Sequence, residues 1–312
     1  MPSTPKTPSY LTLLHSGELS RRVEQARERL RHCMLCPRAC GVDRLAGEVG
    51  YCRSGSAAKV ASYNVHMWEE PPISGVGGSG TIFFSNCTAR CLFCQNYPIS
   101  QLGGGKEVSD QRLAEMMLWL QTHGCHNINL VTPTHFVPQI IHAAQRAAES
   151  GLRIPLVYNT SGYDRVETLA LLDGIIDIYL PDAKYADDRV AREISGFAGY
   201  VAANRAALQE MRRQVGSALV MDSRGLAQRG MVIRHLVLPD DLSQTRAVLS
   251  WIAHELGAET YVSLMAQFFP AYRANERPPL DRRLSRAEYR DALAALSELG
   301  LENGWRQHYG PR

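Results

Sequence analysis

From Thr81 onward the sequence repeats one pattern: a short β-prone apolar run, a polar turn, and a stretch with helical periodicity. Alternating strands and helices favour a parallel sheet, because parallel neighbours need a crossover connection that is usually a helix. The pattern predicts six strands, at 81–85, 127–132, 154–158, 175–180, 231–238 and 260–264. We therefore expect an α/β chain that forms a partial (β/α)6 TIM-like barrel with its helices outside.

Helical periodicity predicts helices at 18–31, 109–123, 138–150, 164–172, 187–211, 242–256 and 286–299. Residues 1–17 are expected to form an irregular lead, and residues 57–80 show no clear periodicity. Within the latter, residues 66–75 are expected to form an ordered loop that covers the edge of the cysteine site, with Glu69 and Glu70 solvated. The predicted division is an N-terminal extension over 1–80, helical and rich in cysteine, followed by the barrel over 81–312.

Three cysteines follow the first predicted strand, in the spacing Cys87-x3-Cys91-x2-Cys94. Cysteine thiolates hold iron–sulfur clusters, and a 4Fe–4S cluster takes four ligands. Three local cysteines leave one iron without a protein ligand, which makes an open metal position. The alternative is zinc bound by two Cys-x2-Cys pairs, but the pairs lie much further apart than the roughly 15–20 residues usual for such sites, and Cys87 is left over.

A second group of four cysteines lies upstream in turn-rich sequence, at Cys33, Cys36, Cys40 and Cys52. Closed sites with four cysteine ligands are usually structural zinc, and a second iron–sulfur cluster is also chemically possible. The sequence favours zinc slightly and leaves both open. Cys125 stands alone and is expected to be a buried core thiol.

Composition narrows the function classes and the compartment. The net charge of +3, from 34 basic and 31 acidic residues, gives no indication of nucleic-acid binding. No apolar run approaches the ~18 residues of a membrane helix, and the first residues lack the apolar core of a signal peptide. Eight cysteines without an export signal are interpreted as metal ligands in a reducing compartment, so we expect a cytoplasmic protein with no membrane partner.

Polar residues cluster at or near the ends of the predicted strands, where barrels of this kind place their active sites. These candidates are Thr132, Thr134 and His135, then Asn159, Thr160 and Ser161, then Asp182 and Lys184, and finally Arg234 and Gln267. Each group alone is a weak signal. Together they predict a single pocket facing the three cysteines, although Lys184 and Arg234 also suit ordinary surface salt bridges.

The cysteine spacing, with Phe93 before the last cysteine, resembles the signature of the radical SAM superfamily. Within it the chain resembles the activating enzymes of glycyl radical enzymes, such as pyruvate formate-lyase activating enzyme, and especially the PflX-like and AmmeMemoRadiSam proteins. The resemblance is carried by the four-cysteine segment, residues 70–73, 91–97, 127–135, 158–163, 182–185 and 234–239.

This resemblance implies a 4Fe–4S cluster on Cys87, Cys91 and Cys94 that cleaves S-adenosylmethionine (SAM) to a 5′-deoxyadenosyl radical for hydrogen abstraction. It implies a reductant such as flavodoxin or ferredoxin and, as the favoured target, a glycine in a partner protein. A small molecule or peptide is the alternative target. A metal-stabilised binding or electron-transfer protein is the alternative from another class.

The resemblance also implies roles for single residues. Phe93 packs near the adenine, and Asn159, Thr160 and Ser161 match a motif that contacts SAM. Lys184, in an Asp182-x-Lys184 pair, meets the SAM carboxylate or the substrate, Arg234 lies near the SAM sugar or carboxylate, and Gln267 stands where relatives have histidine. The family's Gly-Gly-Glu-Pro is replaced by residues 135–138, so Thr134 and His135 are expected to take over that contact.

Overall fold

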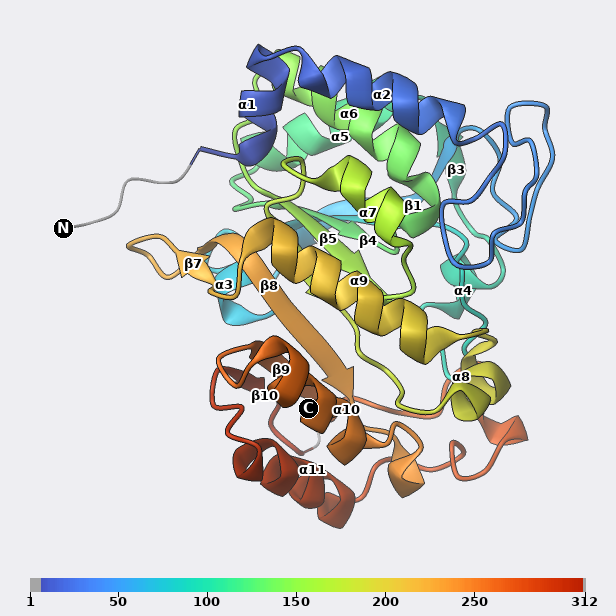
Figure 1. Cartoon of the computed structure of the whole chain (residues 1–312), viewed down its shortest axis with the longest axis vertical. Helices are drawn as coiled ribbons and strands as arrows, with labels where there is room; N and C mark the ends of the chain where they lie inside the picture. Colours follow the sequence, from blue (N-terminus) through green and yellow to red (C-terminus); the bar gives the residue numbers. More distant parts are fainter. Residues whose placement is uncertain (1–6, 311–312) are drawn as a thin grey trace.

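The structure, a computed structural model, describes residues 7–310. The first six residues of the predicted lead and the last two of the predicted barrel therefore lie outside the described residues. One sheet organises the chain (Figure 1). Its strands, in spatial order, are β10 (Gly304–Arg306), β9 (Tyr261–Met265), β8 (Ala227–Leu236), β6 (Ile178–Pro181), β5 (Leu156–Thr160), β4 (Ile128–Val131), β2 (Ser79–Phe84), β1 (Ala58–His66) and β3 (Lys106–Val108), while β7 (Val220–Met221) pairs with β8.

All neighbours from β10 to β2 are parallel, which confirms the six predicted strands and adds β10 as a seventh. Parallel strands place their C-terminal ends at one edge of the sheet. Within residues 7–310 the outermost strands, β10 and β3, do not pair with each other, so the sheet is an open barrel. The predicted partial TIM-like barrel is confirmed.

β1 is a strand that the sequence did not reveal. It pairs antiparallel with β2 and, on its other side, with β3. Only its first residues alternate between buried and half-buried positions, and from Ser62 onward no side chain is buried and three of the five are exposed. A strand with so little buried surface near the edge of a sheet has no clear two-residue periodicity.

Helices cover the convex side of the sheet, with α2, α5 and α6 grouped together and α11 at the opposite end of the molecule (Figure 1). Their bounds are α1 (Ser9–His15), α2 (Glu18–Glu28), α3 (Pro71–Ser74), α4 (Tyr97–Ser100), α5 (Asp110–Thr122), α6 (Val137–Glu149), α7 (Val166–Leu172), α8 (Asp188–Ser195), α9 (Tyr200–Val215), α10 (Thr245–Trp251) and α11 (Arg286–Glu298). Three predictions are corrected: α1 lies within the predicted irregular lead, α3 lies within the predicted loop 66–75, and the predicted helix 187–211 is divided in two. Gly196 and Gly199 at the break adopt left-handed conformations, which end α8 and precede α9.

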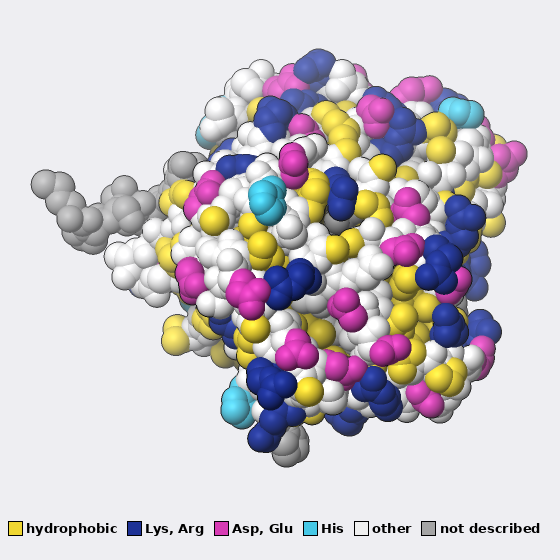
Figure 2. All heavy atoms as spheres, turned by 60° about the horizontal axis from the view of Figure 1, so that its bottom comes forward, with side chains coloured by type: hydrophobic (Ala, Val, Ile, Leu, Met, Phe, Trp, Pro, Cys, Tyr) yellow, Lys and Arg dark blue, Asp and Glu magenta, His cyan; other side chains and the backbone are white. Residues whose placement is uncertain are grey.

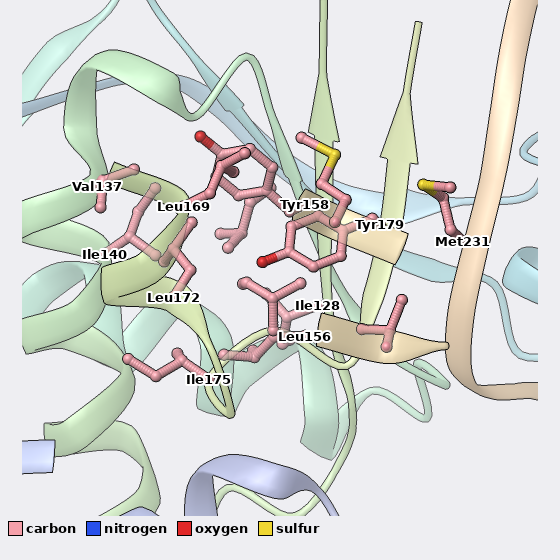
Figure 3. Packing of buried hydrophobic residues seen from close by; sticks show 14 of the residues in the cluster. Ile128, Val137, Ile140, Leu156, Tyr158, Leu169, Leu172, Ile175, Tyr179 and Met231 are labelled. Atoms are coloured by element: carbon pink, nitrogen blue, oxygen red, sulfur yellow. The ribbon is translucent and has the colours of Figure 1, made fainter. Parts of the chain in front are cut away.

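The two faces of the sheet are separated by the two-residue period of its strands. On the outer face, Tyr158 and Tyr179 pack among residues of the helices such as Leu169 (Figure 3). On the inner face, Val157 of β5 and Ile178 of β6 form a second apolar cluster with Leu180, Leu219, Ala227 and Val232. The same alternation assigns four polar strand or strand-end residues to the inner face, namely Asn129, Asn159, Asp182 and Arg234.

The short helix α3 closes the N-terminal end of the inner face. Its Ile73 is fully buried in the inner apolar cluster, and the Ile73 carbonyl accepts a 2.7 Å hydrogen bond from Asn127 Nδ2. Ser79 Oγ in turn donates to Asn127 Oδ1 over 2.7 Å. The helix α3 is therefore fixed against the sheet.

Charged side chains of both signs are interspersed on the face shown in Figure 2. This distribution agrees with the small net charge of the sequence. Among the described residues, the helices are all too short or too polar to cross a membrane.

Candidate active site

The three-cysteine loop begins where β2 ends. Asn86 adopts a left-handed conformation with φ of 68°, which asparagine tolerates better than most residues, and its side-chain amide donates to the Arg53 carbonyl and to Ser54 Oγ. Farther along the loop, the backbone N–H groups of Arg90 and Leu92 donate to carbonyls at the end of α8. The loop is thus held at both ends across the C-terminal edge of the sheet.

The thiols of this loop lie near one another in a buried environment. Burial raises the pKa of Cys87 to about 12 and that of Cys91 to about 11, and neighbouring thiols of the loop contribute to both shifts. The Ala89 N–H donates to Cys87 Sγ over 3.3 Å, and Cys94 Sγ lies 3.0 Å from the Ser100 hydroxyl. Buried thiolates need a positive partner, which a coordinated metal supplies while deprotonating the thiols.

The donor chemistry of this loop therefore fits an iron–sulfur cluster. Within residues 7–310, however, no three histidine, cysteine or carboxylate side chains are arranged as a metal site. The fit rests on the kind, burial and proximity of the thiols.

A row of charged side chains leads from the cysteine loop across the inner face. Lys184 interacts electrostatically with Cys91 and forms a 2.7 Å ion pair with Asp182. Burial alone would lower the pKa of Lys184, but Asp182 and Cys91 raise it above its ordinary value. Arg234 of β8 follows, and its pKa is raised by Glu70, Glu69 and Asp182 against the opposing effect of burial. Neither cation forms an ordinary surface salt bridge.

Glu69 and Glu70 are the residues at the far end of this row, and the expectation that they are solvated is wrong. Glu69 Oε2 lies 3.3 Å from Arg234 Nη1, and Glu70 Oε1 lies 3.6 Å from Arg234 Nε. Asn129 Nδ2 also donates to Glu69 Oε1 over 3.1 Å. Burial and the adjacent Glu70 raise the pKa of Glu69, although Arg234 opposes the shift. The segment before α3 thus brings two carboxylates to the inner face.

These carboxylates border a cavity of about 610 Å³ between the two edges of the open barrel. One wall is the segment from Met67 to Gly75, and the other consists of residues from β9, β10 and the turns that follow them. We call this the seam cavity. Gln267, one of the predicted SAM contacts, lies on it, and the Gln267 carbonyl accepts a 3.1 Å hydrogen bond from Gln95 of the cysteine loop.

Other predicted contacts lie close to the cysteine loop. The Phe93 ring is 5.6 Å from that of Phe268, within a buried cluster that also contains Cys87 and Cys91. Asn159 is partly exposed on the inner face. Thr132 takes a left-handed conformation just after β4, and its N–H donates to the Asn159 carbonyl over 2.9 Å.

Thr134 and Thr160, also predicted to contact SAM, lie in a cluster of buried hydrogen bonds on the outer face. Thr160 Oγ1 donates to Asp164 Oδ2 over 2.7 Å and lies 3.2 Å from Thr134 Oγ1. Tyr158 OH donates to the other Asp164 oxygen over 2.9 Å. Ser161 uses its carbonyl to accept from Tyr200 OH. The structure therefore does not bring the two threonine hydroxyls together with Lys184 and Arg234.

His135 lies with the four upstream cysteines. It borders the same small cavity as Cys33, Cys36, Cys40 and Cys52, and its Nε2 is 3.0 Å from the Ser85 carbonyl. The short 3-10 turn Thr134–Phe136 directs it there. Burial raises the pKa of Cys36, with the three neighbouring thiols adding to the shift. The four thiols are close together, although they do not form a metal site in the structure.

The two cysteine segments are joined by reciprocal arginine contacts. Arg38, from the upstream segment, donates to the Thr88 carbonyl over 2.9 Å. Arg90, from the downstream loop, donates to the Tyr51 carbonyl. Both guanidinium groups lie over the Tyr51 ring, at 3.7 and 4.6 Å from its centroid, which favours cation–π attraction.

Sequence reasoning missed Asn129 as well as Glu69 and Glu70. One signal was available: residues 127–131 contain two asparagines at alternate positions in an otherwise apolar strand, which indicates a polar inner face. For the glutamates, the partner Arg234 is more than 160 residues away, so the local sequence carried no sign of it.

An open parallel barrel with a cysteine loop and charged side chains at its C-terminal strand ends defines a class of α/β enzymes in which loops after the strands bear the active site. Residues 81–221 match the sequence profile of the Radical SAM superfamily. Residues 81–221 therefore form a radical SAM domain.

The chain is 28% identical to uncharacterized protein MJ0674 of Methanocaldococcus jannaschii over 294 residues, which cover 91% of this chain and 80% of that protein. It is similar in fold to the FeFe-hydrogenase maturase HydG, with a TM-score of 0.52 and 10% identity over 92% of the chain. The chain spans 56% of the length of HydG. Methylornithine synthase (PylB) gives a TM-score of 0.49 and 15% identity, covering 95% of this chain and 73% of that one.

The radical SAM domain implies a 4Fe–4S cluster and SAM as cofactors. The likeness to HydG concerns the fold alone.

Proposed function

We propose that this chain cleaves SAM reductively at a 4Fe–4S cluster held by Cys87, Cys91 and Cys94. The bound cluster and SAM supply a 5′-deoxyadenosyl radical that abstracts hydrogen from a substrate. The observation that carries the proposal is the row of charged residues from Cys91 through Lys184 and Asp182 to Arg234. It lies at the strand ends, where this fold bears its reactive groups.

The residues of the chain bind and orient in this proposal. The Lys184 ammonium is a compact charge suited to the SAM carboxylate, and the Asp182 ion pair holds it in position. Phe93, with Phe268, forms an apolar wall beside the cysteine loop that excludes water. Asn159 and Arg234 supply hydrogen bonds from the inner face.

The substrate is proposed to be a glycine in a partner protein, which would receive a radical. The sequence resemblance to activating enzymes supports this target. A small molecule is the second candidate, and the seam cavity supports it, because the cavity reaches Arg234 from outside the barrel. Flavodoxin or ferredoxin is the proposed reductant, and the cytoplasm the proposed compartment.

We propose that Cys33, Cys36, Cys40 and Cys52 hold a second metal, either zinc or an iron–sulfur cluster. Their shared cavity supports this, as do N–H groups directed at sulfur: the Tyr51 N–H donates to Cys40 Sγ over 3.4 Å, and Arg44 Nη1 lies 3.9 Å from Cys33 Sγ. Metal analysis of a triple Cys87, Cys91 and Cys94→Ala variant identifies the element. A metal-free triple variant contradicts the second site.

The main proposal is tested with anaerobically reconstituted protein. With dithionite and SAM, it is expected to release 5′-deoxyadenosine, and protein without release contradicts the proposal. For the target, an anaerobic pull-down followed by EPR is expected to show a glycyl radical on the captured partner. A captured partner without the radical, beside a modified metabolite, favours the small molecule.

A further inference from the structure

The seam cavity contains a buried carboxylate oxygen that lacks a hydrogen-bond partner. Glu70 is 8% exposed, and its Oε2 has no partner among the described residues. Its other oxygen lies 3.6 Å from Arg234 Nε, too long for a strong hydrogen bond, and Arg234 Nε is also unpartnered in the part of the chain that the structure describes. A buried carboxylate in this state is destabilising unless a further donor reaches it.

The charges around this oxygen are not balanced. Two carboxylates, Glu69 and Glu70, share the guanidinium of Arg234, while the next cation, Lys184, is paired with Asp182. Glu69 already receives hydrogen bonds from Asn129 and Arg234. Arg306, the other arginine on the cavity wall, pairs with Glu302 over 3.5 Å. With histidine counted as neutral, the cavity is therefore one positive charge short, and the deficit lies at Glu70.

The remaining walls of the cavity suit an organic body. Met67 and Trp68 border one side, and Met265 and Trp305 border the other. Aromatic faces attract cationic groups, and aromatic and thioether side chains both pack against apolar ones. A phosphate or carboxylate group placed at Glu70 would meet two glutamates and be repelled.

We propose that the seam cavity binds a small organic molecule with a positively charged nitrogen, which donates to Glu70 Oε2 while the carbon body lies between the two walls. The inference rests on the proposed function, because the bound molecule would be the substrate of the proposed radical reaction. Binding itself needs neither reduction nor SAM. About 610 Å³ lies within the range of small-molecule sites.

The test compares two probes of nearly equal shape, benzylamine, which is cationic at pH 7, and benzyl alcohol, which is neutral. Their dissociation constants are measured by ligand-observed NMR on the full-length, anaerobically reconstituted protein without SAM. A charge-assisted hydrogen bond predicts benzylamine to bind about 10- to 100-fold more tightly. Glu70→Gln is expected to reduce this ratio to about 1–2, whereas Glu24→Gln, an exposed glutamate on α2, keeps it.

Equal binding of the two probes to the wild-type protein overturns the inference, and this comparison stands even if Glu70→Gln fails to fold. An unchanged ratio in folded Glu70→Gln also overturns it. A third probe, acetyl-Gly-Lys-Gly-amide, tests whether the cavity instead binds a segment of a partner protein. If the peptide binds and benzylamine does not, the small-molecule assignment is wrong.

Different experimental outcomes would overturn this inference and the proposed function. 5′-Deoxyadenosine release is measured on the same preparations. Release without preference for the cationic probe overturns the inference alone. Preference without release overturns the proposed radical chemistry alone.

Discussion

Two buried polar clusters lie on opposite faces of the same sheet, and they differ in how completely their hydrogen bonds are made. The outer cluster, Thr134, Tyr158, Thr160 and Asp164, surrounds one carboxylate with hydroxyl donors. The inner cluster, Glu69, Glu70, Asn129 and Arg234, contains more charge. Three of its atoms lack a partner among residues 7–310: Glu70 Oε2, Asn129 Oδ1 and Arg234 Nε.

The difference indicates that the outer cluster stabilises the fold and that the inner cluster serves function. A satisfied buried network rigidifies a fold, whereas unpartnered buried groups are costly and are retained where a ligand completes them. We therefore expect changes on the inner face and its cysteine loop to reduce activity more than stability. Changes to the outer cluster should do the reverse.

The largest effect is expected at the cysteine loop. Cys94→Ala removes one of the three proposed cluster ligands and should lower 5′-deoxyadenosine release at least about 100-fold, more than the roughly 10–100-fold typical for residues around a metal site. Release is measured by chromatography after anaerobic reconstitution. Cys125→Ala is the control, because Cys125 is a buried thiol in the main core. Full release by Cys94→Ala would refute the assignment of the cluster.

The next largest effect concerns the ion pair of Asp182 and Lys184. Replacing one member leaves a buried charge unpaired, so the informative variant is the double change Asp182→Asn with Lys184→Met. Removing both partners should leave the melting temperature nearly unchanged and lower 5′-deoxyadenosine release about 10- to 100-fold. Calorimetry and the release assay are run in parallel. Normal release in a stable double variant would show that the pair is structural.

A smaller effect is expected in the outer cluster. Asp164→Ala leaves the hydroxyls of Tyr158 and Thr160 without their acceptor, which should cost about 2 kcal/mol and lower the melting temperature by about 4–8 °C. Release per folded molecule should change less than about twofold. If 5′-deoxyadenosine release per folded molecule also falls by much more than twofold, the result would instead support the predicted contact of Thr160 with SAM.

The smallest effect is a pH dependence at Glu69, whose folded-state pKa is raised by burial. A carboxyl with a raised folded-state pKa stabilises the protein below its unfolded pKa of about 4.3, and this stability is lost as the pH rises through the folded value. Between about pH 4 and 7, wild-type protein should therefore lose about 2–4 °C of melting temperature relative to Glu69→Gln. If the melting temperatures of the two proteins change equally with pH, the Glu69 pKa is unshifted.

The sequence alone was sufficient to predict the six strands that form the parallel core of the sheet. Strands such as β5 and β6 are buried on both faces, so their apolar runs stand out between helical stretches. β1 was missed because its second half is mostly exposed, and burial is what produces periodicity.

The candidate site was predicted only in part. Lys184 and Arg234 were expected in one pocket because strand ends converge in this fold, and the structure places them in one row on the inner face. His135 and Thr134 were assigned by position in a motif, but a 3-10 turn directs His135 to the upstream cysteines. Glu69 was missed because its partners lie on other strands, and charge pairing across a fold leaves no local pattern.

The open sheet has a further consequence. Since no backbone hydrogen bonds join β10 to β3, the width of the seam cavity depends on side chains from two segments far apart in the sequence, residues 67–75 and 305–308. Substitutions there can enlarge or reshape the entrance without disturbing the strands that position the cysteines. If the seam cavity holds the substrate as proposed, radical generation and substrate choice are separable in this architecture, and either can be engineered while the other is kept.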